Sequence, residues 1–174
     1  MSGARGNGHA ESKGTELCLS CGLCCEGVIF NRAALKHDEI RLAKDYDLDY
    51  FPEGEGEFAF RLPCHLYQDD KCSMYLSRPD ACKRYRCDLL KRLTGGNIDL
   101  EESKQIVSQV KSLMDSIDKR MINVEHSGDF RQRVVKFLDL RSRNSMVYKD
   151  SNALLRDIEL FYSNLQQYIE KRAK

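Results

Sequence analysis

All eight cysteines of this 174-residue chain lie between Cys18 and Cys87, and the sequence on either side of that stretch contains none. In a reducing compartment, an even and clustered set of cysteines is typical of a metal site rather than of a disulfide framework. The N-terminal residues lack the apolar segment of a secretion signal, and no apolar run approaches the length needed to span a bilayer. We therefore expect a cytoplasmic protein whose cysteines hold metal.

The first group of cysteines has the pattern Cys18-x2-Cys21-x2-Cys24-Cys25. Two intervening residues let one turn of backbone direct successive sulfurs at the same ion or cluster. Cys24 and Cys25 are adjacent, so their side chains diverge. Either one of these two serves a second centre, or the group binds a polynuclear cluster. We expect Cys18, Cys21 and Cys24 to share one centre with a fourth thiol from the second group.

The second group is more widely spaced and consists of Cys64, Cys72, Cys82 and Cys87. Pro79 suits the first turn of a helix, and a regular helix would carry Cys82 and Cys87 to different faces. We expect one of these two to lie past the helix or on a different centre. The residues between them include the cations Lys83, Arg84 and Arg86. Nearby cations favour the thiolate, which is the form of cysteine that binds metal.

Alternative interpretations of these residues carry less weight. Buried core cysteines do not account for eight cysteines at such short spacing, and disulfides require an oxidising compartment. His65 follows Cys64 and is an additional candidate ligand, ranked below the thiols because a lone histidine is more often a surface residue. The basic run that begins at Lys83 is better explained as a solvated helix face than as a nucleic-acid patch.

The chain divides into three stretches by composition. Residues 1–14 have almost nothing to bury and are predicted to be a disordered tail. Residues 15–93 form the cysteine-rich, metal-binding region, and residues 94–174 form a helical region packed on it. Within the cysteine-rich region, hydrophobic spacing predicts a helix over residues 34–46, and a short strand over residues 57–62 with residues 71–75 as its partner.

The C-terminal stretch has the hydrophobic spacing of three helices. Asp99, followed three residues later by Glu102, predicts the start of the first helix. The next two helices follow the break at residues 127–129 and the cap at Asp150 or Ser151. The apolar stripes are Ile106, Val110, Leu113, Ile117 and Met121; Phe130, Val134, Phe137 and Leu138; and Leu154, Ile158, Phe161, Leu165, Tyr168 and Ile169. The fold class is therefore predicted as α+β, mostly α, with a small irregular cysteine-rich half.

Charge restricts the classes of partner. The chain has 28 basic and 27 acidic side chains, for a formal charge of +1. A protein that binds the phosphate backbone normally carries a clear basic excess, so a nucleic-acid partner is disfavoured. Metal ions are the expected ligands, no membrane is expected, and the C-terminal helices are a candidate surface for a protein partner.

Both cysteine groups together resemble the zinc- or iron-chelating family named after its C-x2-C-x2-C-C motif, also called the YkgJ-type cysteine cluster family. All eight cysteines match its pattern, over residues 16–93. The other matching positions are Pro63 and Leu66 around Cys64, Lys71, Ser73, Met74 and Tyr75 around Cys72, Arg78 with Pro79, and Arg84, Tyr85 and Arg86 before Cys87. The resemblance implies a small cytoplasmic bacterial domain that binds metal or an iron–sulfur cluster. Flagellin lysine methylases, one branch of the family, share the cysteine motif. No further motif in this chain supports the assignment of methyl transfer to it.

Two functional hypotheses follow. In the first, the protein holds iron, as a four-iron four-sulfur cluster or as mononuclear iron, or alternatively zinc, through its eight cysteines. In the second, it is a metalloenzyme of methyl transferase-like or redox type that acts on a protein or small molecule, with one coordination position open beside Glu26 or His65. Iron is favoured because the tandem motif is closer to cluster-binding loops than to the paired C-x2-C of structural zinc sites.

Overall fold

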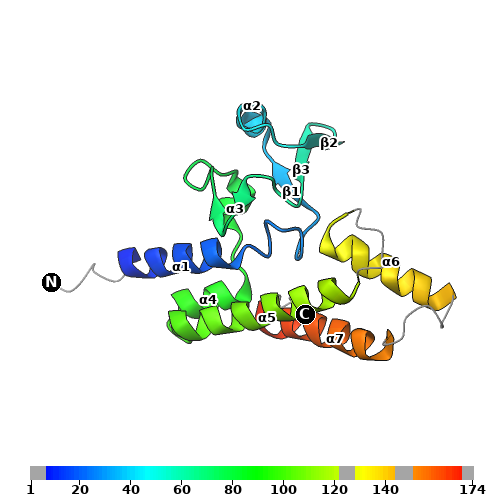
Figure 1. Ribbon diagram of the computed structural model, residues 1–174. Helices are drawn as coiled ribbons and strands as arrows, with labels where there is room; N and C mark the ends of the chain where they lie inside the picture. Colours follow the sequence, from blue (N-terminus) through cyan, green and yellow to red (C-terminus); the bar gives the residue numbers. More distant parts are fainter. Residues whose placement is uncertain (1–6, 122–127, 144–150, 170–174) are drawn as a thin grey trace. The chain divides into compact units, whose positions relative to one another are not determined.

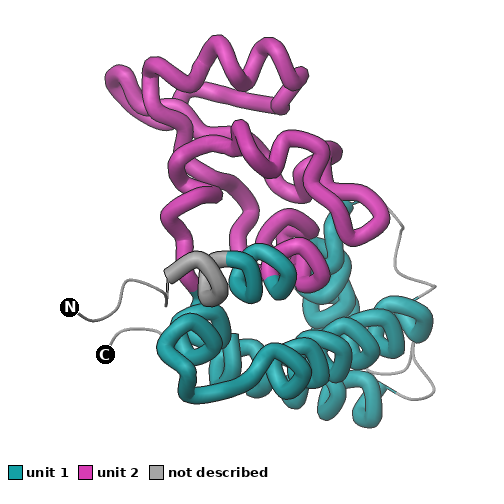
Figure 2. The backbone as a smooth tube through the Cα atoms, turned by 90° about the vertical axis from the view of Figure 1, so that its left-hand side faces the viewer, with its two compact units in different colours: residues 1–17, 87–174 teal, residues 18–86 magenta. Residues whose placement is uncertain are grey.

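The computed structural model describes residues 7–121, 128–143 and 151–169, and the chain forms two compact units (Figure 2). Unit 1 comprises Met1–Leu17 and Cys87–Lys174, and unit 2 comprises Cys18–Arg86. Helices predominate over two small sheets, which confirms the predicted α+β, mostly α class (Figure 1). No helix in the described part of the chain is long and apolar enough to cross a membrane.

Unit 1 is helical. Its elements are α1 (Asn7–Cys21, of which residues up to Leu17 belong to this unit), α4 (Asp88–Thr94), α5 (Leu100–Arg120), α6 (Phe130–Arg143), α7 (Ser151–Asn164) and the helical turn η2 (Leu165–Ile169). Helix α5 lies alongside α7, and η2 packs against α4. The three predicted C-terminal helices are therefore present, with α4 as a short helix before them.

Helix α5 begins where the sequence predicts. The Asp99 carboxylate accepts a hydrogen bond from the backbone N–H of Glu102 at 2.8 Å, which satisfies a donor that the first turn would leave unpaired. Val110 and Ile117 are buried on the predicted apolar stripe, and Met121 is buried just past the helix end. Burial of this stripe, rather than intrinsic propensity, supplies most of the stability of such a helix.

Helices α6 and α7 contribute aromatic side chains to the core of unit 1. The rings of Phe130 and Phe161 meet edge to face with their centroids 5.0 Å apart, and Phe137 is fully buried. Leu138, predicted as part of the α6 stripe, is instead exposed, because it follows Phe137 directly and so lies away from the buried face. Tyr168 is only half-buried. Two residues of the predicted helix starts, Ser127 and Asp150, lie outside the described residues.

The N-terminal helix α1 departs from the sequence prediction. The composition of residues 1–14 predicted a disordered tail, whereas α1 begins at Asn7. Contacts with α4 account for the difference: Gly14 is buried, and a Cβ added there would lie only 3.1 Å from Leu90 Cδ1. Leu17 is also buried, and Glu16 forms an ion pair with Lys104 of α5. Such tertiary contacts stabilise a helix that its own sequence does not favour.

Unit 2 contains two small sheets and short helices. An antiparallel sheet of order β1-β3-β2 is formed by β1 (Arg32–Leu35), β2 (Tyr50–Gly54) and β3 (Glu57–Arg61). The turn η1 (His37–Glu39) and helix α2 (Ile40–Asp45) connect β1 to β2. A two-stranded hairpin of β4 (Tyr67–Gln68) and β5 (Lys71–Cys72) follows, and then α3 (Asp80–Arg84).

Local predictions in unit 2 are correct only in part. The strand predicted over residues 57–62 is β3, but the helix predicted over residues 34–46 starts only with α2 at Ile40, because Leu35 pairs with Phe58 in the sheet. The predicted pairing of residues 71–75 with that strand is wrong. Strand β5 pairs with β4 instead, through a tight turn in which Asp69 and Asp70 both have positive φ.

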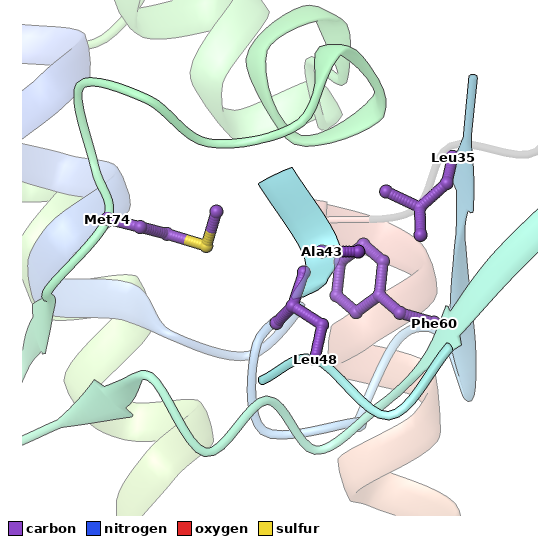
Figure 3. Close-up of a cluster of buried hydrophobic side chains, with 5 residues drawn as sticks. All are labelled: Leu35, Ala43, Leu48, Phe60 and Met74. Atoms are coloured by element: carbon purple, nitrogen blue, oxygen red, sulfur yellow. The ribbon is translucent and has the colours of Figure 1, made fainter. Parts of the chain in front are cut away.

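The core of unit 2 is a cluster of buried side chains, Leu35, Ala43, Leu48, Phe60 and Met74 (Figure 3). Ala43 and Phe60 are almost completely inaccessible to solvent. Three cysteines of the second group, Cys64, Cys72 and Cys82, are partly buried against this cluster. The apolar core therefore fixes the segments that carry those three thiols.

Candidate metal centre

The C-x2-C-x2-C-C segment begins as helix and ends as a compact turn. Helix α1 stops at Cys21, and Gly22 reverses the chain with a φ of +66°. The carbonyl of Leu23 accepts hydrogen bonds from the backbone N–H groups of Val28, at 3.0 Å, and Ile29, at 3.3 Å. Leu23 itself has no accessible surface. The buried leucine anchors the turn, so the cysteines on either side of it are held in fixed places.

Tyr67 connects this turn to the β4–β5 hairpin. Its hydroxyl donates a hydrogen bond to the carbonyl of Leu19 at 2.8 Å and lies 3.1 Å from Oδ1 of Asp70. Burial raises the pKa of the Tyr67 hydroxyl, and the Asp70 carboxylate raises it further, so the hydroxyl remains a donor. A Cβ on Gly22 would overlap the Tyr67 ring, which explains why this position carries glycine.

A second connection joins the two cysteine groups directly. The backbone N–H of Cys64 donates a hydrogen bond to the carbonyl of Cys25 at 2.7 Å. The N–H of Tyr67 in turn donates a hydrogen bond to the carbonyl of Cys64. In the β4–β5 hairpin, Tyr67 lies opposite Cys72. The fold thus brings Cys25, Cys64 and Cys72 into one neighbourhood.

The thiols of Cys25, Cys64, Cys72 and Cys82 form a set that we call the cysteine tetrad. Every pair among these four is close enough for the charge of one to act on the other. Burial, together with the thiols of Cys82, Cys72, Cys64 and Cys21, raises the pKa of Cys25 to about 12. Burial and the thiols of Cys64 and Cys72 likewise raise the pKa of Cys82 to about 11. Without a cation beside them, the thiols of Cys25 and Cys82 therefore retain their protons at neutral pH.

The positive charges near the cysteines are only partly those that the sequence indicated. Arg84 pairs with Asp80 at 2.5 Å, and Arg86 donates hydrogen bonds to the carbonyls of Lys83 and Tyr85. Arg78 lowers the pKa of both Cys18 and Cys82, against the larger raising effect of burial on each thiol. Arg86 also lowers that of Cys18. The sequence analysis singled out Arg78 only as part of the Arg-Pro pair of the resemblance.

The remaining predicted ligands have separate settings. Cys18 and Cys21 lie in the last turn of α1, and Cys24 lies in the turn that follows. Cys87 is past α3, as expected for one of the last two cysteines, and its Sγ accepts a hydrogen bond from the N–H of Leu90 at the start of α4. Cys87 belongs to unit 1, whereas the other seven cysteines belong to unit 2. His65 is exposed, and its carbonyl accepts a hydrogen bond from the Gln68 side chain.

The chemistry of the donor set fits a thiophilic metal. The eight cysteines, all within the described residues, form no disulfides, and seven of them are at least partly buried. Across residues 7–121, 128–143 and 151–169, no three or more His, Cys, Asp or Glu side chains already form a group that could hold an ion. The tetrad therefore gathers sulfur donors without the close convergence of a coordination shell.

These features define a class: a small α+β protein in which a cysteine-rich unit gathers free thiols around an apolar core. Residues 17–111 match the family model CxxCxxCC, described as "Putative zinc- or iron-chelating domain". The match covers more than half of the chain, and the protein belongs to this family, which confirms the resemblance seen in the cysteine pattern. No curated protein and no solved structure matches the chain significantly.

Proposed function

We propose that the protein binds iron, or alternatively zinc, and that the cysteine tetrad of Cys25, Cys64, Cys72 and Cys82 supplies the ligands of one centre. The observation that carries this proposal is the meeting of their segments: Cys64 is hydrogen-bonded to the backbone of Cys25, and Cys64, Cys72 and Cys82 pack against the same apolar cluster. Four thiolates are a common ligand set for zinc and for iron–sulfur clusters. A bound iron–sulfur cluster would supply electron transfer, whereas zinc would stabilise the fold.

The surroundings of the tetrad support metal binding by its cysteines rather than a role as core residues alone. Three of its members pack against the apolar cluster of unit 2, which limits access of water to the sulfurs. The fourth, Cys25, is tied to Cys64 through the backbone. Their segments are short strands, turns and a five-residue helix, and small movements of these draw the sulfurs together around an ion. Metal then replaces the thiol protons and contributes its binding energy to the fold.

Cys18, Cys21, Cys24 and Cys87 remain candidate ligands of this protein. The expected sharing of one centre by Cys18, Cys21 and Cys24 is a separate proposal from the tetrad, which takes Cys25 from the first group. A reducing, cytoplasmic location suits both, because cysteines that form no disulfides persist there as thiols.

The test is the metal content of protein purified without oxygen. Iron, zinc and acid-labile sulfide are measured in the wild type and in Cys25→Ser, Cys64→Ser, Cys72→Ser and Cys82→Ser. We expect each tetrad variant to lose the same centre, with iron and labile sulfide missing together if the centre is a cluster. Arg41→Met, which changes an exposed side chain outside both cysteine groups, is the control and should retain the metal content of the wild type. The tetrad is excluded if its four variants fold and retain the metal content of the wild type.

A further inference from the structure

Arg78 lies in the chain between Cys72 and Cys82, two members of the cysteine tetrad. A turn closed by the bond from the Ser77 N–H to the Met74 carbonyl, at 3.0 Å, precedes it, and the buried Pro79 follows it at the start of α3. The guanidinium carbon lies 3.7 Å from the centroid of the Tyr75 ring. The N–H of Tyr75 bonds the carbonyl of Cys72. The cation and the aromatic ring that supports it are thus fixed relative to Cys72.

The guanidinium of Arg78 lacks the partners that its chemistry requires. Its Nε is buried and makes no hydrogen bond within the described residues. Nor does any carboxylate of the described residues form an ion pair with Arg78, whereas the nearby Arg84 is paired with Asp80. A buried donor on a charged group is costly unless it meets a negative charge. The position of Arg78 therefore calls for an anionic group that the apo protein does not provide.

Cysteines of both groups lie near this charge. Cys72 is linked to it through Tyr75, which stacks on the guanidinium and bonds to the Cys72 carbonyl. Cys82 lies on α3, which begins directly after Pro79, and Cys18 belongs to the first cysteine group, in the last turn of α1. When four cysteines give up their protons to a divalent ion, their negative charge exceeds the charge of the ion. A partly buried centre of this kind is more stable with a fixed cation beside it.

We infer that Arg78, supported by the Tyr75 ring, compensates the excess negative charge of the metal-loaded cysteine tetrad and thereby strengthens metal binding. This inference rests on the proposed function. Arg78 is a positioning residue and not a ligand, because a guanidinium has no lone pair to offer a metal. Its two requirements are a positive charge and the stacked geometry, and these can be changed separately.

The experiment measures the affinity of reduced, metal-free protein for Zn²⁺ by competition with a chromogenic chelator under anaerobic conditions. We expect Arg78→Met to raise the dissociation constant about 10- to 100-fold, the range typical of residues that support metal ligands. Arg78→Lys keeps the charge and should recover most of the affinity. Tyr75→Leu leaves the charge but removes its support, and an intermediate loss is expected. Arg41→Met is the control, since it removes an equal charge from an exposed side chain and should leave the affinity unchanged.

Thermal melting of the metal-free variants separates charge compensation from folding. Arg78→Lys and Arg78→Met should melt within a few degrees of each other while their zinc affinities differ. Wild-type affinity in Arg78→Met, or equal losses in Arg78→Lys and Arg78→Met, would overturn the role of Arg78 and leave the tetrad intact. Absence of Zn²⁺ binding to the wild type would instead overturn the centre itself, and the inference with it.

Discussion

The carbonyl of Cys25 accepts a 2.7 Å hydrogen bond from the backbone N–H of Cys64, although 38 residues of chain separate them. This bond places the last cysteine of the C-x2-C-x2-C-C motif beside the first cysteine of the second group. Of the adjacent pair Cys24 and Cys25, it is Cys25 whose backbone is bonded to the second group, and the proposed tetrad takes its fourth member there.

Alanine at Gly22 should destabilise unit 2 strongly. Gly22 has a φ of +66°, and an added Cβ would overlap the ring and hydroxyl of Tyr67. Both backbone strain and steric overlap oppose the substitution, and we expect a loss of at least about 3 kcal/mol in the free energy of unfolding. Urea denaturation checks this value.

Gly56→Ala is the matched control for Gly22→Ala. Gly56 has a similar φ of +75°, but no atom lies within 4 Å of the added Cβ. Only the backbone cost remains, about 1 kcal/mol. Equal losses of unfolding free energy in the two variants would show that the close approach of Gly22 to Tyr67 does not affect stability.

Substitution of Phe161 by aspartate should unfold or severely destabilise unit 1. Phe161 is fully buried and contacts the Phe130 ring, so a charge there has no partner. The expected loss is about 4 kcal/mol or more, measured by chemical denaturation. Leu160→Asp, at the exposed neighbouring position, should cost less than about 1 kcal/mol. Similar losses at both positions would contradict the packing of α7.

Metal removal should lower the melting temperature of the protein. The thiols of the tetrad come from separate short segments, and bound metal links those segments together. Calorimetry of metal-loaded protein before and after chelation, with metal content measured in both samples, tests this expectation. An unchanged melting temperature after verified removal would mean that metal contributes nothing to the fold.

The stability of the reduced, metal-free protein should fall as the pH rises above 9. The pKa of Cys25 is about 12 in the folded protein, against 9.0 for an ordinary cysteine. The unfolded chain therefore loses this proton first, and the stabilisation that is complete below pH 9 disappears toward pH 12. Between pH 8 and pH 10 the wild type should lose about 1 kcal/mol more than Cys25→Ser. If the free energies of unfolding of the wild type and of Cys25→Ser changed with pH in the same way, the raised pKa of Cys25 would be excluded.

Sequence reasoning succeeded where the determining interactions are local. The Asp99 cap and the stripe of α5 depend on residues three and four apart, which a sequence displays directly. It failed where contacts between segments far apart in the sequence determine the secondary structure. Leu35 belongs to a strand because Phe58 pairs with it, and α1 extends back to Asn7 because α4 covers it. The grouping of Cys25 with Cys82 is likewise tertiary, so spacing revealed the donors but not this grouping.

Unit 2 is an insertion between two segments of unit 1, which makes it a large closed loop. The approach of Gly14 to Leu90 holds α1 and α4 together near the two points where the chain leaves and re-enters unit 1. Folding of unit 1 therefore reduces the number of conformations available to residues 18–86 in the metal-free chain. The entropy that a metal must remove to order the cysteines is correspondingly smaller than for the same segment with free ends. We expect the helical unit to favour metal binding in this way without contributing a ligand to the proposed tetrad.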